Sequence, residues 1–197
     1  MEREQYKGLT IRLEQDQDCE NPLDNDAGVV FVTYRADARS QYGNTPLDQE
    51  EHEEVARKIQ AGELIGLPVY VYEHGGVIIK AEEGNPFSCP WDSGQSGYVY
   101  CTRKTALEWQ GGKVLTAKRR AAVLKGLQCS VDAYSSWCNG ECYGYIIEGA
   151  DGEELESCWG FIGDEYAMEE AKRSADYWAP EVVRRAKNEV LAARCPL

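Results

Sequence analysis

The sequence predicts an α+β fold, with a mostly antiparallel sheet of about six or seven strands and three or four helices packed on it. Three observations favour this class. Short apolar segments with strand-like patterns recur along the chain, pairs of them are separated only by glycine-containing turns, and longer segments begin with helix-capping residues. Strands joined by short turns pair antiparallel, and helices then cover a face of the sheet. We expect a single domain over residues 1–197.

The first half of the chain supplies most of the predicted strands. The earliest alternates apolar and polar residues through Leu9, Ile11 and Leu13, as a half-buried strand does. A predicted hairpin turns at Glu73-His74-Gly75-Gly76, where glycine permits a positive φ. Pro68 indicates that its strand begins there or lies at an edge, because proline has no amide hydrogen to donate. The predicted strands of this half are 8–15, 28–35, 67–72, 77–80 and 97–101.

The starts of the internal helices are predicted from capping residues. Asp48 precedes a charged segment that ends at Gly62, while Thr102 and Thr116 precede a short and a long helical segment. The long segment carries apolar residues at helical spacing, so we expect that face to meet the core. Those residues are Leu124, Leu127, Val131 and Tyr134. The two longer predicted helices are 49–60, within a candidate insertion over residues 36–63, and the segment from Thr116 to about Trp137.

The last part of the chain combines a hairpin with terminal helices. Gly149-Ala150-Asp151-Gly152 separates two strand-like segments, 141–148 and 153–160, which we expect to pair. Residues 165–194 have a helical pattern. We expect one helix to end near residue 177 and another to begin at Pro180 and run to Ala193, because proline is favoured at the first position of a helix.

Charge and composition exclude several classes of function. The chain carries 21 Lys and Arg against 34 Asp and Glu, a formal charge of −13 at pH 7. Phosphate contacts need clustered cations, and anionic membranes repel such a chain, so we expect neither direct nucleic-acid binding nor membrane attachment. No apolar segment approaches the roughly 20 residues of a membrane span, and residues 1–7 are too polar for a signal peptide. We expect a soluble intracellular protein.

The eight cysteines do not form a recognisable metal-binding pattern. Only Cys138 and Cys142 lie close in sequence, and the second tight pair of a zinc site is missing. The alternating carboxylates over residues 16–26 lack the glycine and the bidentate glutamate of a calcium loop. We therefore expect no metal and no cofactor, and mostly unpaired thiols. Convergence of Cys129 and Cys158 with the close pair remains an alternative.

The most unusual chemistry lies in Pro86-Phe87-Ser88-Cys89-Pro90-Trp91-Asp92-Ser93-Gly94-Gln95-Ser96-Gly97. Proline fixes φ and glycine permits rare φ values, so such a loop can be rigid, and rigid loops commonly carry binding sites. The segment Glu156-Ser157-Cys158-Trp159-Gly160-Phe161-Ile162-Gly163-Asp164 again places a Ser-Cys pair beside an aromatic residue and glycines. We expect the sheet to bring these two segments into one recess.

The loop also resembles a motif of an uncharacterised protein family of bacteriophages and mobile elements. Its hallmarks are a Pro-Phe-Ser-Cys-Pro-Trp-Asp-Ser-Gly-Gln loop, an upstream Tyr-(Asp/Glu)-His-(Ser/Gly)-Gly turn and a late Ser-Cys-Trp-Gly-Phe segment. The matching segments here are 87–95, 72–76 and 157–161, within a likeness that runs from about Asn21 to Ala171. Asp26-Ala27 and the region from Ala36 to Glu63 depart from the family. The resemblance implies a phage-type accessory gene, and such genes often encode small acidic proteins that blunt host defence.

The candidate ligand-binding residues come from both Ser-Cys segments and the hairpin turn. They are His74, Trp91, Asp92, Ser93, Gln95, Cys158 and Trp159. Indole planes beside fixed carboxylate and amide groups suit a nucleotide-derived ligand. The alternative is that both tryptophans fill the core and that Asp92 and Ser93 satisfy the backbone of their own loop.

A catalytic alternative uses Cys89 as nucleophile, His74 as base and Asp92 to orient the imidazole, as in a cysteine-dependent hydrolase or transferase. The competing interpretations are a buried structural thiol and a hydrogen-bonded turn histidine. His52 is the other histidine and lies in the charged helix. With so few histidines and no evident catalytic group of residues, an enzyme is the less favoured hypothesis.

Together these observations predict an acidic phage-type protein that works by binding in the host cytoplasm. The expected partner is a host defence protein, whose basic nucleic-acid groove an acidic surface would occupy, or a small nucleotide-like signalling molecule. The first partner predicts affinity that falls with salt, and the second predicts retention of nucleotide on purification. The sequence leaves the oligomeric state open, and a dimer is compatible with it.

Overall fold

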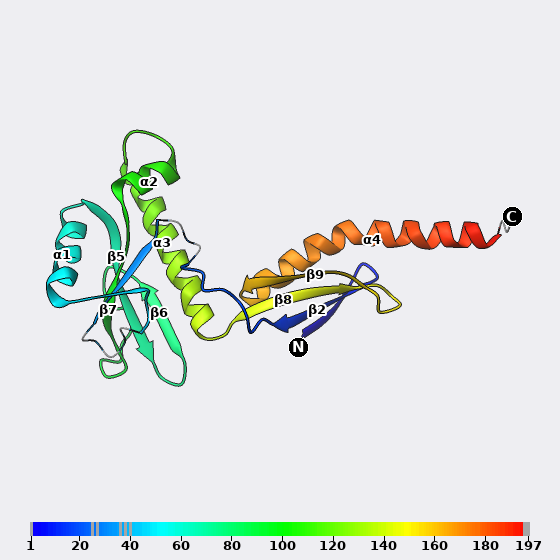
Figure 1. Ribbon diagram of the computed structural model, residues 1–197, viewed down its shortest axis with the longest axis horizontal. Coiled ribbons are helices and arrows are strands. Elements are labelled where there is room, and N and C mark those ends of the chain that lie inside the picture. The colour runs from blue at the N-terminus through cyan, green and yellow to red at the C-terminus, as the bar shows by residue number, and fades with distance from the viewer. Residues whose placement is uncertain are drawn as a thin grey trace. The chain divides into compact units, whose positions relative to one another are not determined.

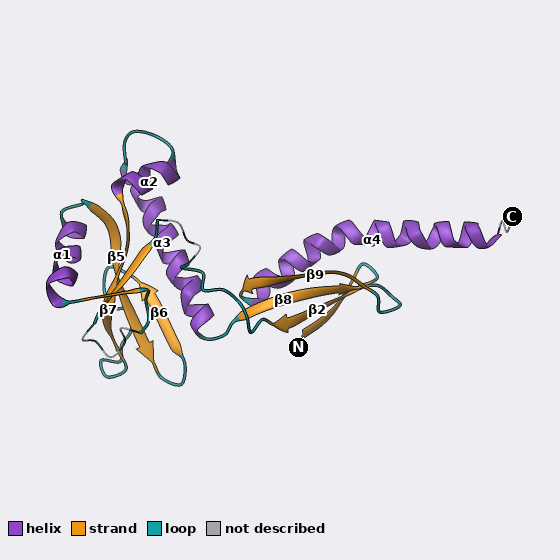
Figure 2. Cartoon of the chain, in the orientation of Figure 1, coloured by secondary structure: helices purple, strands orange, loops and turns teal. Residues whose placement is uncertain are grey.

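The computed structural model describes residues 2–24, 26, 28–35, 37, 39 and 41–194, with side chains as far as residue 185 and at 187 (Figure 1). The described part of the chain contains four helices and nine strands in two mostly antiparallel sheets, so the predicted α+β class is confirmed and the strand count is exceeded (Figure 2). None of its helices is long and apolar enough to span a membrane.

The chain divides into two compact units where the sequence led us to expect one domain. Unit 1 comprises the described residues up to Glu20 and those from Gly140 onward, and unit 2 comprises Asn21–Asn139. Unit 2 is therefore an insertion into unit 1. The N-terminal strands of unit 1 pair with a hairpin that comes more than a hundred residues later, as the pairing of Gln15 with Tyr143 shows, and no local pattern reveals such a pairing.

Unit 1 is a four-stranded antiparallel sheet with a long helix on one face. Its strands run in the order β1-β2-β8-β9. Their bounds are Glu2–Tyr6 for β1, Leu9–Gln15 for β2, Cys142–Glu148 for β8 and Glu154–Ile162 for β9. The helix α4 spans Asp164–Arg194 and buries Ala167, Ala171 and Ala175 against apolar residues of β2 and β8. Three alanines on one face let the helix lie close to the sheet.

The predicted break before Pro180 is absent, since α4 is continuous through that residue. Proline has helical φ and removes one hydrogen bond, so a helix can continue through it where packing compensates. Trp178 and Val182 pack on the core of unit 1 on either side of Pro180, which supplies that packing.

Unit 2 is a five-stranded sheet in the order β4-β3-β7-β5-β6, in which only the β3–β4 pair is parallel. The strand bounds are Val30–Tyr34 for β3, Thr45–Leu47 for β4, Leu64–Glu73 for β5, Val77–Ala81 for β6 and Ser93–Thr102 for β7. The helix bounds are Gln49–Gln60 for α1, Arg103–Gln110 for α2 and Ala117–Cys138 for α3. Residues 36–63, the candidate insertion, thus supply β4 and α1 to this unit, although Ala36, Ala38 and Ser40 lie outside the described residues.

The caps predicted for all three helices of unit 2 are present. Asp48 accepts the Glu51 amide while the Glu51 side chain accepts the Asp48 amide, and the Thr102 and Thr116 hydroxyls each accept an amide of the first helical turn. Along α3 the predicted residues Leu127 and Val131 are buried, whereas Leu124 is only partly buried. The sequence pattern therefore located this helix and most of its core face.

Pro68 lies inside a central strand, so the predictions of a strand start or a sheet edge at this residue are wrong. On one side β5 pairs with β7 at Pro68, but on the other side its pairing with β6 begins only at Val69. Because Pro68 has no amide hydrogen to donate, the β5–β6 ladder begins one residue after it. The Pro68 carbonyl still accepts the Glu82 amide at 3.1 Å.

Candidate functional site

The loop that carries the predicted motif is held by its own polar side chains. We call residues 85–92, between β6 and β7, the tryptophan loop. The Phe87 amide donates to Asn85 Oδ1 at 3.0 Å, and Asn85 Nδ2 donates to Ser93 Oγ at 3.4 Å. The Ser93 hydroxyl donates to the Cys89 carbonyl at 2.5 Å. These bonds close the loop on itself, as the alternative interpretation of Ser93 predicted.

The same loop is attached to the end of β5. The Phe87 ring stacks on Tyr72 of β5, with ring centroids 5.5 Å apart. The Glu73 amide donates to the Asp92 carbonyl at 2.9 Å. One aromatic contact and one backbone bond therefore fix both ends of the tryptophan loop to the strand that precedes the His74 turn.

The three residues of the catalytic alternative meet at one oxygen atom. His74 Nδ1 lies 3.3 Å from Asp92 Oδ2, and the Cys89 thiol donates to that same oxygen, also at 3.3 Å. A nucleophilic cysteine needs its imidazole base within hydrogen-bonding reach, and among the contacts of the described residues none joins Cys89 to His74. The Asp92 carboxylate contacts both groups, an arrangement that holds the loop to the turn.

Trp91 is the most exposed large apolar side chain of the loop. It is 91% exposed, so it does not fill the core of unit 2. A cavity of about 540 Å³ beside the loop is lined by Pro86, Leu67 and Leu124, among others. None of the predicted ligand-binding residues lines it. Gln95 is exposed, but it lies in β7 and not in the loop, because β7 begins at Ser93.

The second Ser-Cys segment belongs to unit 1 and lies in β9. Trp159 is 45% exposed, and its ring lies so close to Gly144 of β8 that a Cβ there would come within 2.1 Å of it. Cys158 is exposed. β9 continues through Gly160, which lies at a register shift between β8 and β9. The φ of Gly160 is +89°, and its amide donates to Asp16 Oδ2 at 3.0 Å. Trp91 and Trp159 thus belong to different units with different sheets, so no single sheet brings the two Ser-Cys segments together.

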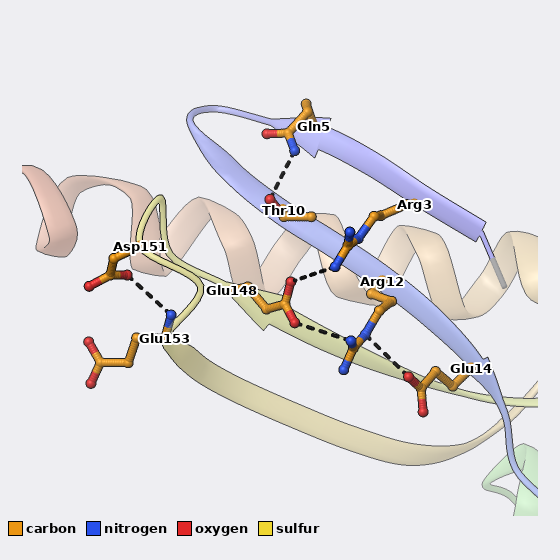
Figure 3. Close-up of polar contacts among 8 residues, drawn as sticks. All are labelled: Arg3, Gln5, Thr10, Arg12, Glu14, Glu148, Asp151 and Glu153. Carbon is orange, nitrogen blue, oxygen red and sulfur yellow. Dashed lines mark hydrogen bonds and ion pairs between the residues drawn. The ribbon is translucent and has the colours of Figure 1, made fainter.

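The face of the unit 1 sheet that carries Trp159 also carries an ion-pair network (Figure 3). Glu148 pairs with Arg3 and with Arg12, both at 3.3 Å, and Arg12 Nε lies 3.2 Å from Glu14. These charges neutralise one another, so the network stabilises the sheet surface and leaves little net charge there.

Net charge is unequal between the two units. Unit 1 has 19 acidic and 9 basic residues, and unit 2 has 15 and 12. Most of the −13 charge therefore belongs to unit 1, whereas the unit that carries the tryptophan loop is close to neutral. Long-range attraction of a basic partner would act mainly on unit 1.

Comparison with protein-family models, with curated proteins and with solved structures gives no match.

Several residues near the loop were missed by the sequence analysis. Tyr42 donates a hydrogen bond to Glu73, and burial together with this bond raises the pKa of Tyr42 to about 12. Arg39 pairs with Asp37 at 2.8 Å and lies against Gly94, where a Cβ would meet its guanidinium at 2.6 Å. The only sequence signal for Tyr42 and Arg39 is that they lie among polar residues before Thr45, and that segment contains no recognisable motif.

The second histidine has a structural environment that the sequence did not predict. His52 of α1 lies between Tyr34 and Tyr98, with ring centroids 5.5 and 5.0 Å apart. Burial lowers the pKa of His52. This histidine is thus part of an aromatic cluster between α1 and the sheet and does not belong to the tryptophan loop.

Proposed function

We propose that this protein is a phage-type accessory protein that counters a host defence system by binding a host protein, and that the tryptophan loop makes the contact. The observation that carries the proposal is Trp91, a 91% exposed indole on a loop fixed by hydrogen bonds. Exposed tryptophans on pre-ordered loops are the side chains that dominate protein interfaces, since they bury much area at little cost in conformational entropy.

A protein partner is favoured over an enclosed nucleotide by the surroundings of Trp91. An enclosed ligand needs walls, and Ser93 is occupied with its own loop while Asp92 already contacts His74 and Cys89. A highly exposed indole on a unit of small net charge instead suits a complementary protein pocket. The resemblance to phage proteins supplies the expectation of host defence as the target.

The acidic unit 1 supports the same proposal in a second way. Its excess of ten negative charges would speed association with a basic host protein, while Trp91 would supply the short-range contact. Raising the salt concentration should then slow association, and removing the indole should speed dissociation.

The test compares phage plating on hosts that carry defined defence systems, with and without the gene. The wild-type protein should raise plating on at least one defended host, and Trp91→Ala should lose that effect while folding normally. Loss of one central tryptophan contact weakens binding about 30-fold, equivalent to about 2 kcal/mol. Trp159→Phe is the matched control. Unchanged plating on every defended host, or full activity of Trp91→Ala, would refute the proposal.

A cysteine-dependent hydrolase or transferase remains the second candidate, because Cys89, His74 and Asp92 do converge on one atom. A Cys89→Ser variant separates the two ideas in the same plating assay. An enzyme would lose its effect with Cys89→Ser, whereas the binding protein would keep it, since the hydroxyl can still donate to Asp92.

A further inference from the structure

Two cysteines of unit 1 that are far apart in sequence have thiols in contact. The Cys19 and Cys142 side chains share a hydrogen bond, and the Cys19 thiol also donates to the Glu20 carbonyl at 3.7 Å. Cys142 is 2% exposed, at the start of β8, whereas Cys19 is half-buried.

The backbone explains why these thiols meet. The last paired residues of β2 and β8 are Gln15 and Tyr143, and the Asp16 amide then donates to the Cys142 carbonyl at 2.8 Å. Asp16 next accepts the Asp18 amide at 3.0 Å, which turns the chain back. Residue 19 is thereby returned to the start of β8, where Cys142 lies.

The pair occupies a distinctive place in the chain. Cys19 is one residue before the last residue of the first segment of unit 1, and Cys142 is the third residue after the chain returns from unit 2. All 119 residues of unit 2 therefore lie between the two thiols. A bond between them would close the chain covalently around the whole insertion.

Burial determines which thiol reacts first. Burial, the bond to Cys19 and the nearby carboxylates of Asp16 and Glu141 raise the pKa of Cys142 to about 12. Cys142 therefore keeps its proton near neutral pH, and the more accessible Cys19 is the thiol that meets an oxidant in solution.

We propose that Cys19 and Cys142 form an oxidation site that a low-molecular-weight disulfide of the glutathione type converts to an intramolecular disulfide. The Cys19 thiolate attacks one sulfur of the oxidant and displaces one glutathione thiolate, which takes up the proton that Cys19 released. Cys142 then loses its proton to solvent, attacks the Cys19 sulfur of the mixed disulfide and displaces the second glutathione. Two protein thiols are oxidised and one small disulfide is reduced to two thiols. This inference goes beyond the proposed function and does not depend on it.

The experiment incubates the folded full-length protein with oxidised and reduced glutathione at several ratios, quenches free thiols by alkylation and maps cysteine peptides by mass spectrometry. The expected product is a peptide pair that joins Cys19 to Cys142, without glutathione attached. The exposed Cys129 and Cys158 should be recovered as alkylated thiols or mixed disulfides. The oxidised protein should also melt at a higher temperature, because a disulfide that closes a long loop restricts the unfolded chain.

Two variants make the result specific. Cys19→Ser should abolish the linked peptide and the gain in melting temperature, while Cys158→Ser, in the same unit, should change neither. Both variants are compared with the wild type under reducing conditions to confirm the fold by circular dichroism. Recovery of Cys19 and Cys142 as separately alkylated peptides, or of Cys19 only as a stable glutathione adduct, would overturn the proposal.

Discussion

The Ser135 hydroxyl of α3 accepts a 2.9 Å hydrogen bond from the backbone amide of Ile79 in β6, the outer strand of the unit 2 sheet. Asn139 does the same for Val77, accepting its amide at 3.1 Å and donating to its carbonyl at 2.6 Å. Gln128 donates a 3.0 Å hydrogen bond to the Ala81 carbonyl, also in β6. Side chains of one helix therefore occupy the backbone groups that an outer strand normally leaves open to pairing with another chain.

The first prediction follows from this arrangement. Ser135→Ala removes the acceptor and leaves the fully buried Ile79 amide without a partner, which should lower the free energy of unfolding by about 1–3 kcal/mol. Urea denaturation of the purified protein measures the change. Ser136→Ala, next along α3, is the control and should lie within about 0.5 kcal/mol of the wild type. Equal effects of the two variants would mean that the hydrogen bond to β6 contributes nothing.

Gly97 provides a prediction about the contact of β3 with β7. A Cβ at this position would lie 1.9 Å from the Val32 carbonyl oxygen, which is backbone and cannot move aside without disrupting the sheet. We expect Gly97→Ala to destabilise the protein by at least about 2 kcal/mol, at the upper part of the range for overpacking.

The matched control for that variant is Gly84→Ala, since a Cβ there meets no atom within 4 Å. Thermal unfolding of both variants should show a clear loss for Gly97→Ala and almost none for Gly84→Ala. A stable Gly97→Ala protein would show that β3 and β7 lie further apart than the structure has them.

Glu156 provides a prediction about pH. Burial alone would raise the pKa of Glu156, but hydrogen bonds from Trp178, Ser174 and Tyr145 outweigh it and leave the pKa below its ordinary value of 4.5. A lowered pKa means that this carboxylate stabilises the fold fully above about pH 4.5 and loses that contribution as the pH falls through the folded-state pKa. Glu156→Gln should therefore be less stable than the wild type by about 1–2 kcal/mol at pH 7.

The difference between these two proteins should shrink as the pH falls below about 4.5 and through the lower folded-state pKa of Glu156, because the wild-type carboxyl then becomes protonated as well. Urea titrations across a pH series measure it. Glu153→Gln, a change at an exposed residue of the same hairpin, should give no such dependence. A difference that stays constant or grows at acid pH would contradict the assignment.

The structure of the tryptophan loop predicts unequal effects on stability when its two aromatic residues are replaced. Phe87 stacks on Tyr72, so Phe87→Ala should cost about 1–2 kcal/mol and loosen the loop. Trp91 makes no such contact, so Trp91→Ala should lie within about 0.5 kcal/mol of the wild type. Denaturation curves measure both, and a large loss with Trp91→Ala would remove the basis for treating its exposure as functional.

Much of the fold could be predicted because its signals are local. Capping residues located α1, α2 and α3, and alternation located β2 through Leu9, Ile11 and Leu13. β1 was missed because it is almost entirely polar, with Arg3 and Glu4 on opposite faces of an outer strand. Such a strand buries little and so carries no hydrophobic pattern, and its pairing with β2 is what defines it.

The candidate site could be predicted in part, because the composition of its loop is also a local signal. The composition of the Cys89–Asp92 segment indicated an ordered loop, and the hydrogen bonds of Ser93 and the contact between His74 and Asp92 agree with that prediction. Which of the three side chains, His74, Cys89 or Asp92, lies between the other two depends on the folded geometry and cannot be read from their spacing in the sequence. Hence the sequence suggested a cysteine–histidine pair, while the structure has a carboxylate between those two groups.

By itself, the amino-acid sequence determined the α+β class, the starts of α1, α2 and α3, the turn at Gly75 and the loop that holds Trp91, because each depends on the conformational preferences of a few neighbouring residues. Only the tertiary structure decided that β2 pairs with β8, that unit 2 is inserted into unit 1, that Trp91 faces water and that Cys19 meets Cys142. Those outcomes depend on which distant segments pack together. The free energy of such contacts depends on burial and strand register, and a local sequence pattern specifies neither.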